Sequence, residues 1–148
     1  MDATITDEEL AGLVRRTEEA AGGRMRGDMN RYLDLVHHAA GFTLLPPTGG
    51  PASRHQDRTA EFSGWVSPFA DGEARLEHVE IHAWGDTVVL ARIERQHGRV
   101  GNQPDQNLSM RVTHVYRRDG SDWELVHRHA DPLVAMISPD QLHELMRR

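Results

Sequence analysis

The feature of this sequence that most limits its fold is a run of four strand-like segments in the second half of the chain. They span residues 75–84, 87–96, 108–118 and 122–131, and are separated by Gly85-Asp86, a loop between Gly98 and Asn107, and Asp119-Gly120. Such short connections join antiparallel neighbours, since a parallel crossover needs about a dozen residues or more. We therefore expect an antiparallel meander.

The first half of the chain has helical periodicity instead. Thr6 begins a capping-box pattern, and the helix that follows is expected to end at Gly22-Gly23. Asp28 caps a second helix, which Gly41 closes. A strand at 42–47, a third helix over 57–69 and a last helix from Pro139 complete the expected elements. Helices followed by a meander define an α+β fold, and we expect one domain over residues 1–148.

Composition excludes several kinds of chemistry. The chain has 148 residues and a formal net charge of −6, and all 17 of its basic residues are arginine. Without lysine it has neither a Schiff-base amine nor a lysine-bearing phosphate loop, and without cysteine it has no thiolate or disulfide. An acidic chain without a basic stripe also argues against nucleic-acid binding.

No segment of the sequence predicts export or membrane insertion. The N-terminal stretch MDATITDEEL is acidic and has no apolar core, so we do not expect it to act as a signal peptide. No apolar run approaches the roughly 18 residues that a membrane helix needs. We expect a cytoplasmic protein without a membrane partner.

The last strand segment carries the main candidates for catalysis. In DWELVHRHADPL, alternate positions are Trp123, Leu125, His127, His129 and Asp131, which would share one face of a strand. The two imidazoles and the carboxylate could form an acid–base group. They could equally form a structural network at the strand end, or two metal ligands that would need a third imidazole from elsewhere. We predict no metal site.

A second carboxylate and a set of ligand-binding residues complete the candidates. Glu94 lies in the middle of a strand, where it is expected to form an ion pair with Arg92 or Arg111, with a role as a base as the alternative. The predicted ligand-binding residues are Tyr32, Trp65, Phe69, His82, Arg111 and Thr113. For the aromatic residues among them, core packing is the competing explanation.

Three stretches of the sequence resemble a known family. SMRVTHVYRRDGSDWELVHRHADPL, HVEIHAWGDTVVLARIER and GFTLLPPTGG are similar to the strands of SnoaL-like and ketosteroid-isomerase-like proteins of the nuclear transport factor two-like superfamily. The resemblance covers roughly residues 28 to 133 and extends to the hub domain of calcium/calmodulin-dependent kinases. It implies a cone of curved antiparallel sheet around N-terminal helices, with a pocket at the wide end and homodimers formed through the sheet.

The function that the resemblance implies is broad, because this superfamily includes enzymes and non-catalytic binders. We expect a cofactor-free acid–base enzyme of the isomerase, cyclase or dehydratase type that acts on a hydrophobic small molecule. The alternative is a non-catalytic dimeric module that binds a ligand or a partner. The carboxylate base and neutral donor of ketosteroid isomerases have no matching residues here.

Overall fold

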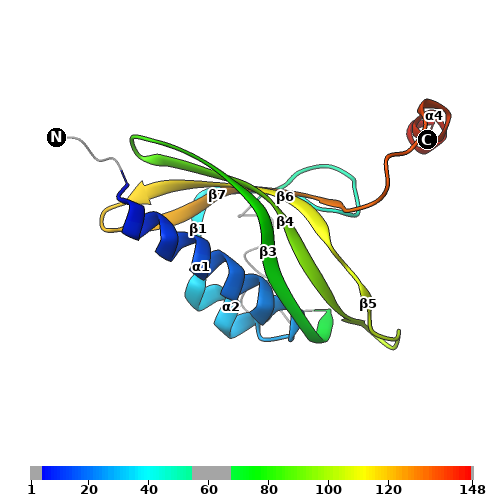
Figure 1. Cartoon of the computed structure of the whole chain (residues 1–148), viewed down its shortest axis with the longest axis horizontal. Coiled ribbons are helices and arrows are strands. Elements are labelled where there is room, and N and C mark those ends of the chain that lie inside the picture. Colours follow the sequence, from blue (N-terminus) through cyan, green and yellow to red (C-terminus); the bar gives the residue numbers. More distant parts are fainter. Residues whose placement is uncertain (1–4, 55–67, 148) are drawn as a thin grey trace.

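A mixed sheet curves around two N-terminal helices in the computed structural model, which describes residues 5–54 and 68–147 (Figure 1). The elements are α1 (Asp7–Met25), α2 (Met29–Leu35), β1 (His37–Leu45), β2 (Ser53–Arg54), β3 (Phe69–Trp84), β4 (Thr87–Val100), β5 (Gln106–Asn107), β6 (Met110–Asp119), β7 (Asp122–Pro132) and α4 (Pro139–Met146). The strand order is β2-β1-β7-β6-β4-β3, and β5 pairs with β4. The predicted α+β class is confirmed.

The expected antiparallel meander is present in β3, β4, β6 and β7, which pair as consecutive neighbours. The sequence predicted an early strand but not its pairing partner. β1 lies parallel to β7, so that the first strand of the chain pairs with the last and the sheet is mixed.

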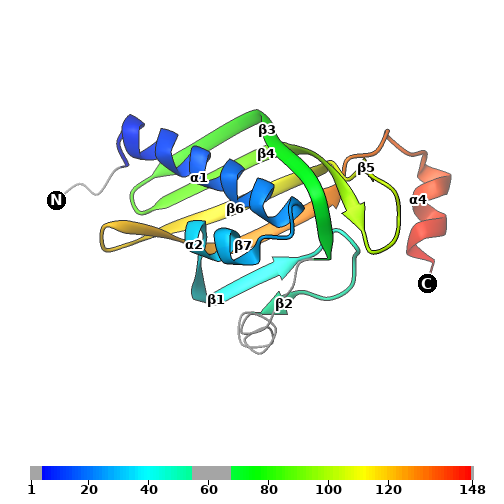
Figure 2. The same cartoon turned by 90° about the horizontal axis from the view of Figure 1, so that it is seen from below.

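Helices α1 and α2 cover one face of the sheet, which we call the inner face (Figure 2). Side chains from both layers form the hydrophobic core: Leu13, Tyr32, Phe42, Val88, Leu90, Tyr116, Trp123 and Leu125 are all buried. The opposite, outer face carries no helix among the described elements. A residue's position on the inner or outer face therefore decides whether it can contribute to an enclosed site.

Both N-terminal helices differ in length from the prediction. α1 continues through Gly22 and Gly23 and ends at Met25. Gly27 follows with a positive φ of 83°, and a Cβ atom there would lie only 2.8 Å from the Phe69 carbonyl oxygen. α2 was predicted to reach Gly41 but ends at Leu35. The next residues pair with β7, and this tertiary pairing overrides their helical pattern.

The sheet takes up more of the chain than predicted. β3 begins at Phe69, and β4 extends to Val100. Phe69 was predicted to end a third helix over 57–69, and in the structure it is instead the first residue of a strand. The rest of that predicted helix, including Trp65, lies almost entirely outside the described residues.

The last helix has the predicted start, since Ser138 and Gln141 form a capping box and Pro139 occupies the first turn. α4 extends away from the sheet, and its residues are exposed (Figure 1). Among the described residues, no helix is both long and apolar enough to cross a membrane.

Candidate functional site

A β-bulge in β7 separates the side chains that were predicted to share one face. Val115 pairs with His127, but the next residue of β6, Tyr116, pairs with Leu125, so Val126 is an extra residue in β7. Trp123 and Leu125 are buried on the inner face. After the bulge the alternation is reversed, and the buried positions are Arg128 and Ala130. The prediction that Trp123, Leu125, His127, His129 and Asp131 lie on one face is therefore wrong.

The inner face carries a buried ionic group, which we call the arginine cluster: Arg24, Arg92, Arg128 and Glu94. Glu94 Oε1 accepts hydrogen bonds from Arg92 Nη2 (2.8 Å) and Arg128 Nη1 (2.9 Å). Its Oε2 accepts from Arg128 Nη2 and Arg24 Nη2, both at 3.1 Å. The two bonds from Arg128 form a bidentate guanidinium–carboxylate pair. Three elements, α1, β4 and β7, thus meet at one carboxylate.

The charge of Glu94 is fixed by its three partners. Burial alone would raise the pKa of this carboxyl, since its side chain is only 1% exposed, but Arg128, Arg24 and Arg92 together hold the pKa well below its usual range. Glu94 is therefore anionic and a weak proton acceptor. The predicted ion pair with Arg92 is present, whereas Arg111 pairs with Asp131 on the outer face.

A buried hydrogen-bond chain leads away from the arginine cluster through His114. Arg128 Nη1 lies 2.9 Å from His114 Nε2, and Arg92 Nη2 lies 3.2 Å from His114 Nδ1. Nδ1 is also 3.3 Å from the Tyr116 oxygen. The Tyr116 hydroxyl lies 2.7 Å from Thr17 Oγ1, and Thr17 in turn donates to the Leu13 carbonyl (2.8 Å). This buried chain therefore connects the arginine cluster to α1.

His114 is held neutral. Burial, followed by the charges of Arg92 and Arg128, lowers the pKa of this imidazole well below 6.5. His114 is not among the site residues that the sequence predicted. Its position beside the cluster depends on the pairing of β6 with β4 and β7, which residue types alone do not specify.

The depressed pKa of His114 predicts a stability that falls in acid. Below pH 6.5 this ring binds a proton in the unfolded chain but not in the folded chain. The contribution of neutral His114 to the free energy of unfolding is therefore fully present above pH 6.5 and is lost as the pH falls. We expect the free energy of unfolding of the unmodified protein to fall by up to about 1.4 kcal/mol more per pH unit than that of His114→Gln. Urea unfolding between pH 7.5 and 5 measures both slopes, and parallel slopes would contradict a neutral His114. His97, with a pKa raised by its hydrogen bond to Asp105, is common to both proteins and cancels.

An aromatic pair lies beside the cluster on the inner side. The Tyr32 hydroxyl is 3.0 Å from His38 Nε2, and the His38 ring stacks on Phe42 with centroids 4.2 Å apart. The guanidinium of Arg24 lies 5.8 Å from the centroid of the Tyr32 ring. Tyr32, a predicted ligand-binding residue, therefore lies close to the arginine cluster, together with an imidazole that sequence reasoning did not select.

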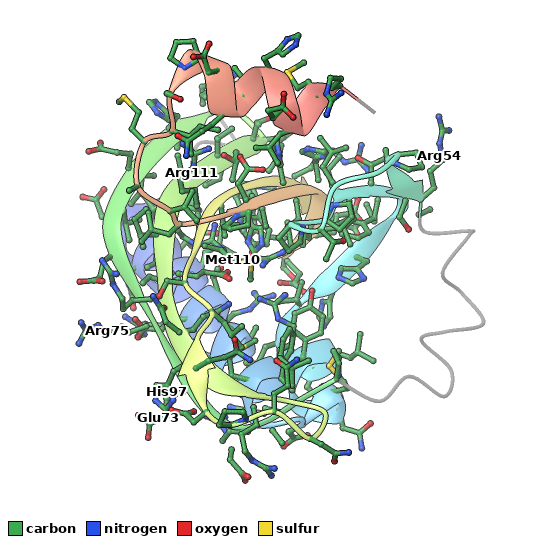
Figure 3. All side chains as sticks on the ribbon, turned by 90° about the vertical axis from the view of Figure 1, so that its right-hand side faces the viewer. Arg54, Glu73, Arg75, His97, Met110 and Arg111 are labelled. Atoms are coloured by element: carbon green, nitrogen blue, oxygen red, sulfur yellow. The ribbon has the colours of Figure 1, made fainter. Side chains whose placement is uncertain are left out.

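Four of the predicted residues meet on the outer face instead. Arg111, Thr113, His129 and Asp131 line a depression of about 260 Å³ between β6, β7 and β4. Asp131 accepts from Arg111 Nη2 (3.1 Å) and lies 3.2 Å from His129 Nε2. Met110 and Arg111, labelled in Figure 3, illustrate the change of face, since Met110 is buried and its neighbour is exposed.

The remaining predicted residues do not join either group. His127 lies 2.7 Å from Thr43 Oγ1 of β1, and burial, with the nearby His129, lowers its pKa. Phe69 begins β3, His82 is exposed near the β3–β4 turn, and Trp65 lies outside the described residues. Within 5–54 and 68–147, no three His, Cys, Asp or Glu side chains lie close enough to hold a metal ion.

Comparison with known proteins identifies the family. The model of the SnoaL-like domain matches residues 19–135. Similar solved structures include an NTF2-like superfamily protein from Salmonella enterica (15% identity, TM-score 0.70, covering 90% of this chain and 94% of that one). A candidate dehydratase of the NTF2-like family from Streptomyces avermitilis is also similar (21%, 0.66, 87% and 97%). A third is the association domain of C. elegans CaMKII (17%, 0.63, 85% and 99%).

No curated protein matches the sequence. At 15–21% identity, the similarity to these solved structures concerns the fold, and it extends over 85–90% of this chain. The family model spans most of the chain, including α2, the meander and β7. This chain therefore belongs to the SnoaL-like family and has the NTF2-like fold.

Proposed function

We propose that this protein binds a small molecule against the inner face of its sheet and transfers a proton to or from it. The observation that carries the proposal is the arginine cluster, because charged side chains occupy positions at which a sheet packed on helices normally buries apolar residues. Ionisable groups whose pKa values are strongly shifted by burial and by specific charged partners, as in Glu94 and His114, cluster at functional sites.

The residues beside the cluster suit an acid–base reaction. Tyr32 and His38 form a hydroxyl–imidazole pair at 3.0 Å, and an imidazole is the side chain that most readily exchanges protons near neutral pH. Glu94 and His114 both hold partners in place, so we assign them positioning roles. Proton transfer without a cofactor fits the isomerase, cyclase or dehydratase classes, and the similar Streptomyces avermitilis protein is itself described as a candidate dehydratase.

The outer-face depression supports a second candidate function. It is lined by His129, Asp131, Arg111 and Thr113, which the sequence predicted as catalytic or ligand-binding residues. Partly exposed apolar side chains, Val89, Ala91, Ile93 and Val115, lie on the same face. A homodimer formed through the outer face would cover the depression and these apolar side chains, and the protein would then be a non-catalytic interaction module. The similar C. elegans domain is named as an association domain.

Native mass spectrometry of untagged protein, followed by denaturing analysis of whatever dissociates, tests both candidates. We expect a dimer that carries a bound organic molecule. The double variant Tyr32→Phe/His38→Gln should lose the bound molecule. The matched double variant on the outer face, His129→Gln/Asp131→Asn, should keep it. The opposite pattern would move the site to the outer depression. An empty dimer that turns over no compound would favour the interaction module.

A further inference from the structure

In the arginine cluster, Arg92 and Arg128 bring two positive charges to the single carboxylate of Glu94. Arg92 and Arg128 have side chains that are 0% and 5% exposed, and both form ion pairs with Glu94. His114, which contacts both arginines, is neutral and supplies no counter-charge. Two buried guanidinium groups thus share one carboxylate, to which Arg24 also donates. An uncompensated buried charge is costly, so a further anion at this position would be stabilising.

Hydrogen-bond donors in the cluster are also incompletely used. Arg92 Nε is buried and has no acceptor among the described residues. Arg92 Nη1 has only a long contact of 3.5 Å with the Leu90 carbonyl, whereas Nη2 bonds Glu94. A buried donor without a partner loses its hydration and gains nothing in return. Charge and hydrogen bonding therefore both indicate a missing acceptor.

The exposed fractions of the four side chains indicate from which side a ligand could reach the arginine cluster. Arg92 and Glu94 are closed off from solvent, while the side chain of Arg24 is 11% exposed and that of Arg128 is 5% exposed. An incoming group would therefore approach along the side of Arg128, on the side of the cluster where Arg24 lies 5.8 Å from the centroid of the Tyr32 ring. A planar carboxylate suits a position beside these arginines, since guanidinium and carboxylate groups form two parallel hydrogen bonds.

We propose that the small molecule bound on the inner face carries a carboxylate, which the arginine cluster binds beside Glu94. This rests on the proposed function and adds the chemical class of the ligand to it. The cluster already binds the carboxylate of Glu94 with four hydrogen bonds. The ligand carboxylate would supply the second negative charge, and the rest of the molecule would lie toward Tyr32 and His38.

The experiment uses sodium acetate, inorganic phosphate and acetamide as probes, each added to the unmodified full-length protein at constant ionic strength. Arginine Nε–H resonances of ¹⁵N-labelled protein are the readout, and Arg92→Lys and Arg128→Lys assign the two signals. We expect acetate to shift the Arg128 and Arg92 signals saturably and acetamide, its neutral analogue of similar shape, to leave them unchanged. Arg111, an exposed arginine paired with Asp131, is the internal control and should not saturate.

A variant strengthens the test. Glu94→Gln removes the competing carboxylate while keeping its shape, so acetate should bind it about fivefold more tightly or better. Arg111→Gln, the matched change on the outer face, should bind acetate as the unmodified protein does. If Glu94→Gln does not fold alone, folding that is restored by acetate and not by acetamide gives the same answer.

The outcomes separate this inference from the function on which it rests. Saturation by phosphate rather than acetate, equal effects of acetamide, or equal shifts at Arg111 would overturn the carboxylate assignment. A neutral molecule found by native mass spectrometry would overturn it as well while leaving the proposed function intact. If acetate binds saturably but no natural ligand or turnover is found, the carboxylate site stands and the catalytic proposal fails.

Discussion

Replacing Glu94 by alanine is expected to lower the free energy of unfolding by about 4 kcal/mol. The substitution removes the carboxylate that accepts from Arg24, Arg92 and Arg128, and leaves these buried cations facing one another. The loss is much larger than that of an ordinary salt bridge, because buried charges cannot regain water when their partner is deleted. Urea unfolding monitored by tryptophan fluorescence measures the change.

The matched control is Glu124→Ala. Glu124 also accepts from an arginine, Arg117, but this pair lies on the outer face with side chains 21% and 55% exposed. Its removal should cost about 1 kcal/mol or less. Similar losses at the two positions would mean that the arginine cluster is hydrated and contributes little to the fold.

Replacing Gly72 by alanine is expected to destabilise the protein by about 3 kcal/mol or more. A Cβ atom at this position would lie 2.2 Å from the His97 carbonyl oxygen, and 3.0 Å from Gly98 Cα and from Met25 Cβ. Backbone atoms of the neighbouring strand cannot rotate away as a flexible side chain can, so β3 and β4 must separate. Thermal unfolding compares this variant with the unmodified protein.

Gly41→Ala provides the comparison for Gly72. Gly41 also lies in a strand, but a Cβ there would meet no described atom within 4 Å. Alanine at this position should be neutral or stabilising by a few tenths of a kcal/mol, because it restricts the unfolded chain. If both variants unfold at the same temperature, the close approach of β3 to β4 at Gly72 is not a constraint on the fold.

Periodicity predicted most of the elements but not the faces of the strands. The turns at Gly85-Asp86 and Asp119-Gly120 correctly located two hairpins, and the Ser138 cap located α4. Alternation by itself does not tell which side of a sheet is covered, since both faces are equally periodic. The buried face of the sheet is the one on which α1 packs, and no local pattern in the strand sequences indicates where α1 packs.

The candidate site was predicted in part for the same reason. Glu94 was selected, and one of its two expected arginine partners was correct. Arg128 was not selected, because the bulge at Val126 reverses the alternation between His127 and the preceding Leu125. The adjacent apolar residues Leu125 and Val126 were the available signal, since two neighbouring apolar side chains interrupt a period of two.

The parallel pairing of β1 with β7 has a consequence for how the chain acquires its fold. Thr43 and His127, which hydrogen-bond across this pair, are separated by 84 residues in the sequence. During synthesis one backbone edge of β1 therefore stays unpaired until β7 has left the ribosome. Contacts between such distant segments slow folding, because the entropy of closing the loop is lost before the sheet forms. The α1 helix and the β3–β4 hairpin, built from local contacts, would form first, and the arginine cluster would be assembled only when β7 arrives with Arg128.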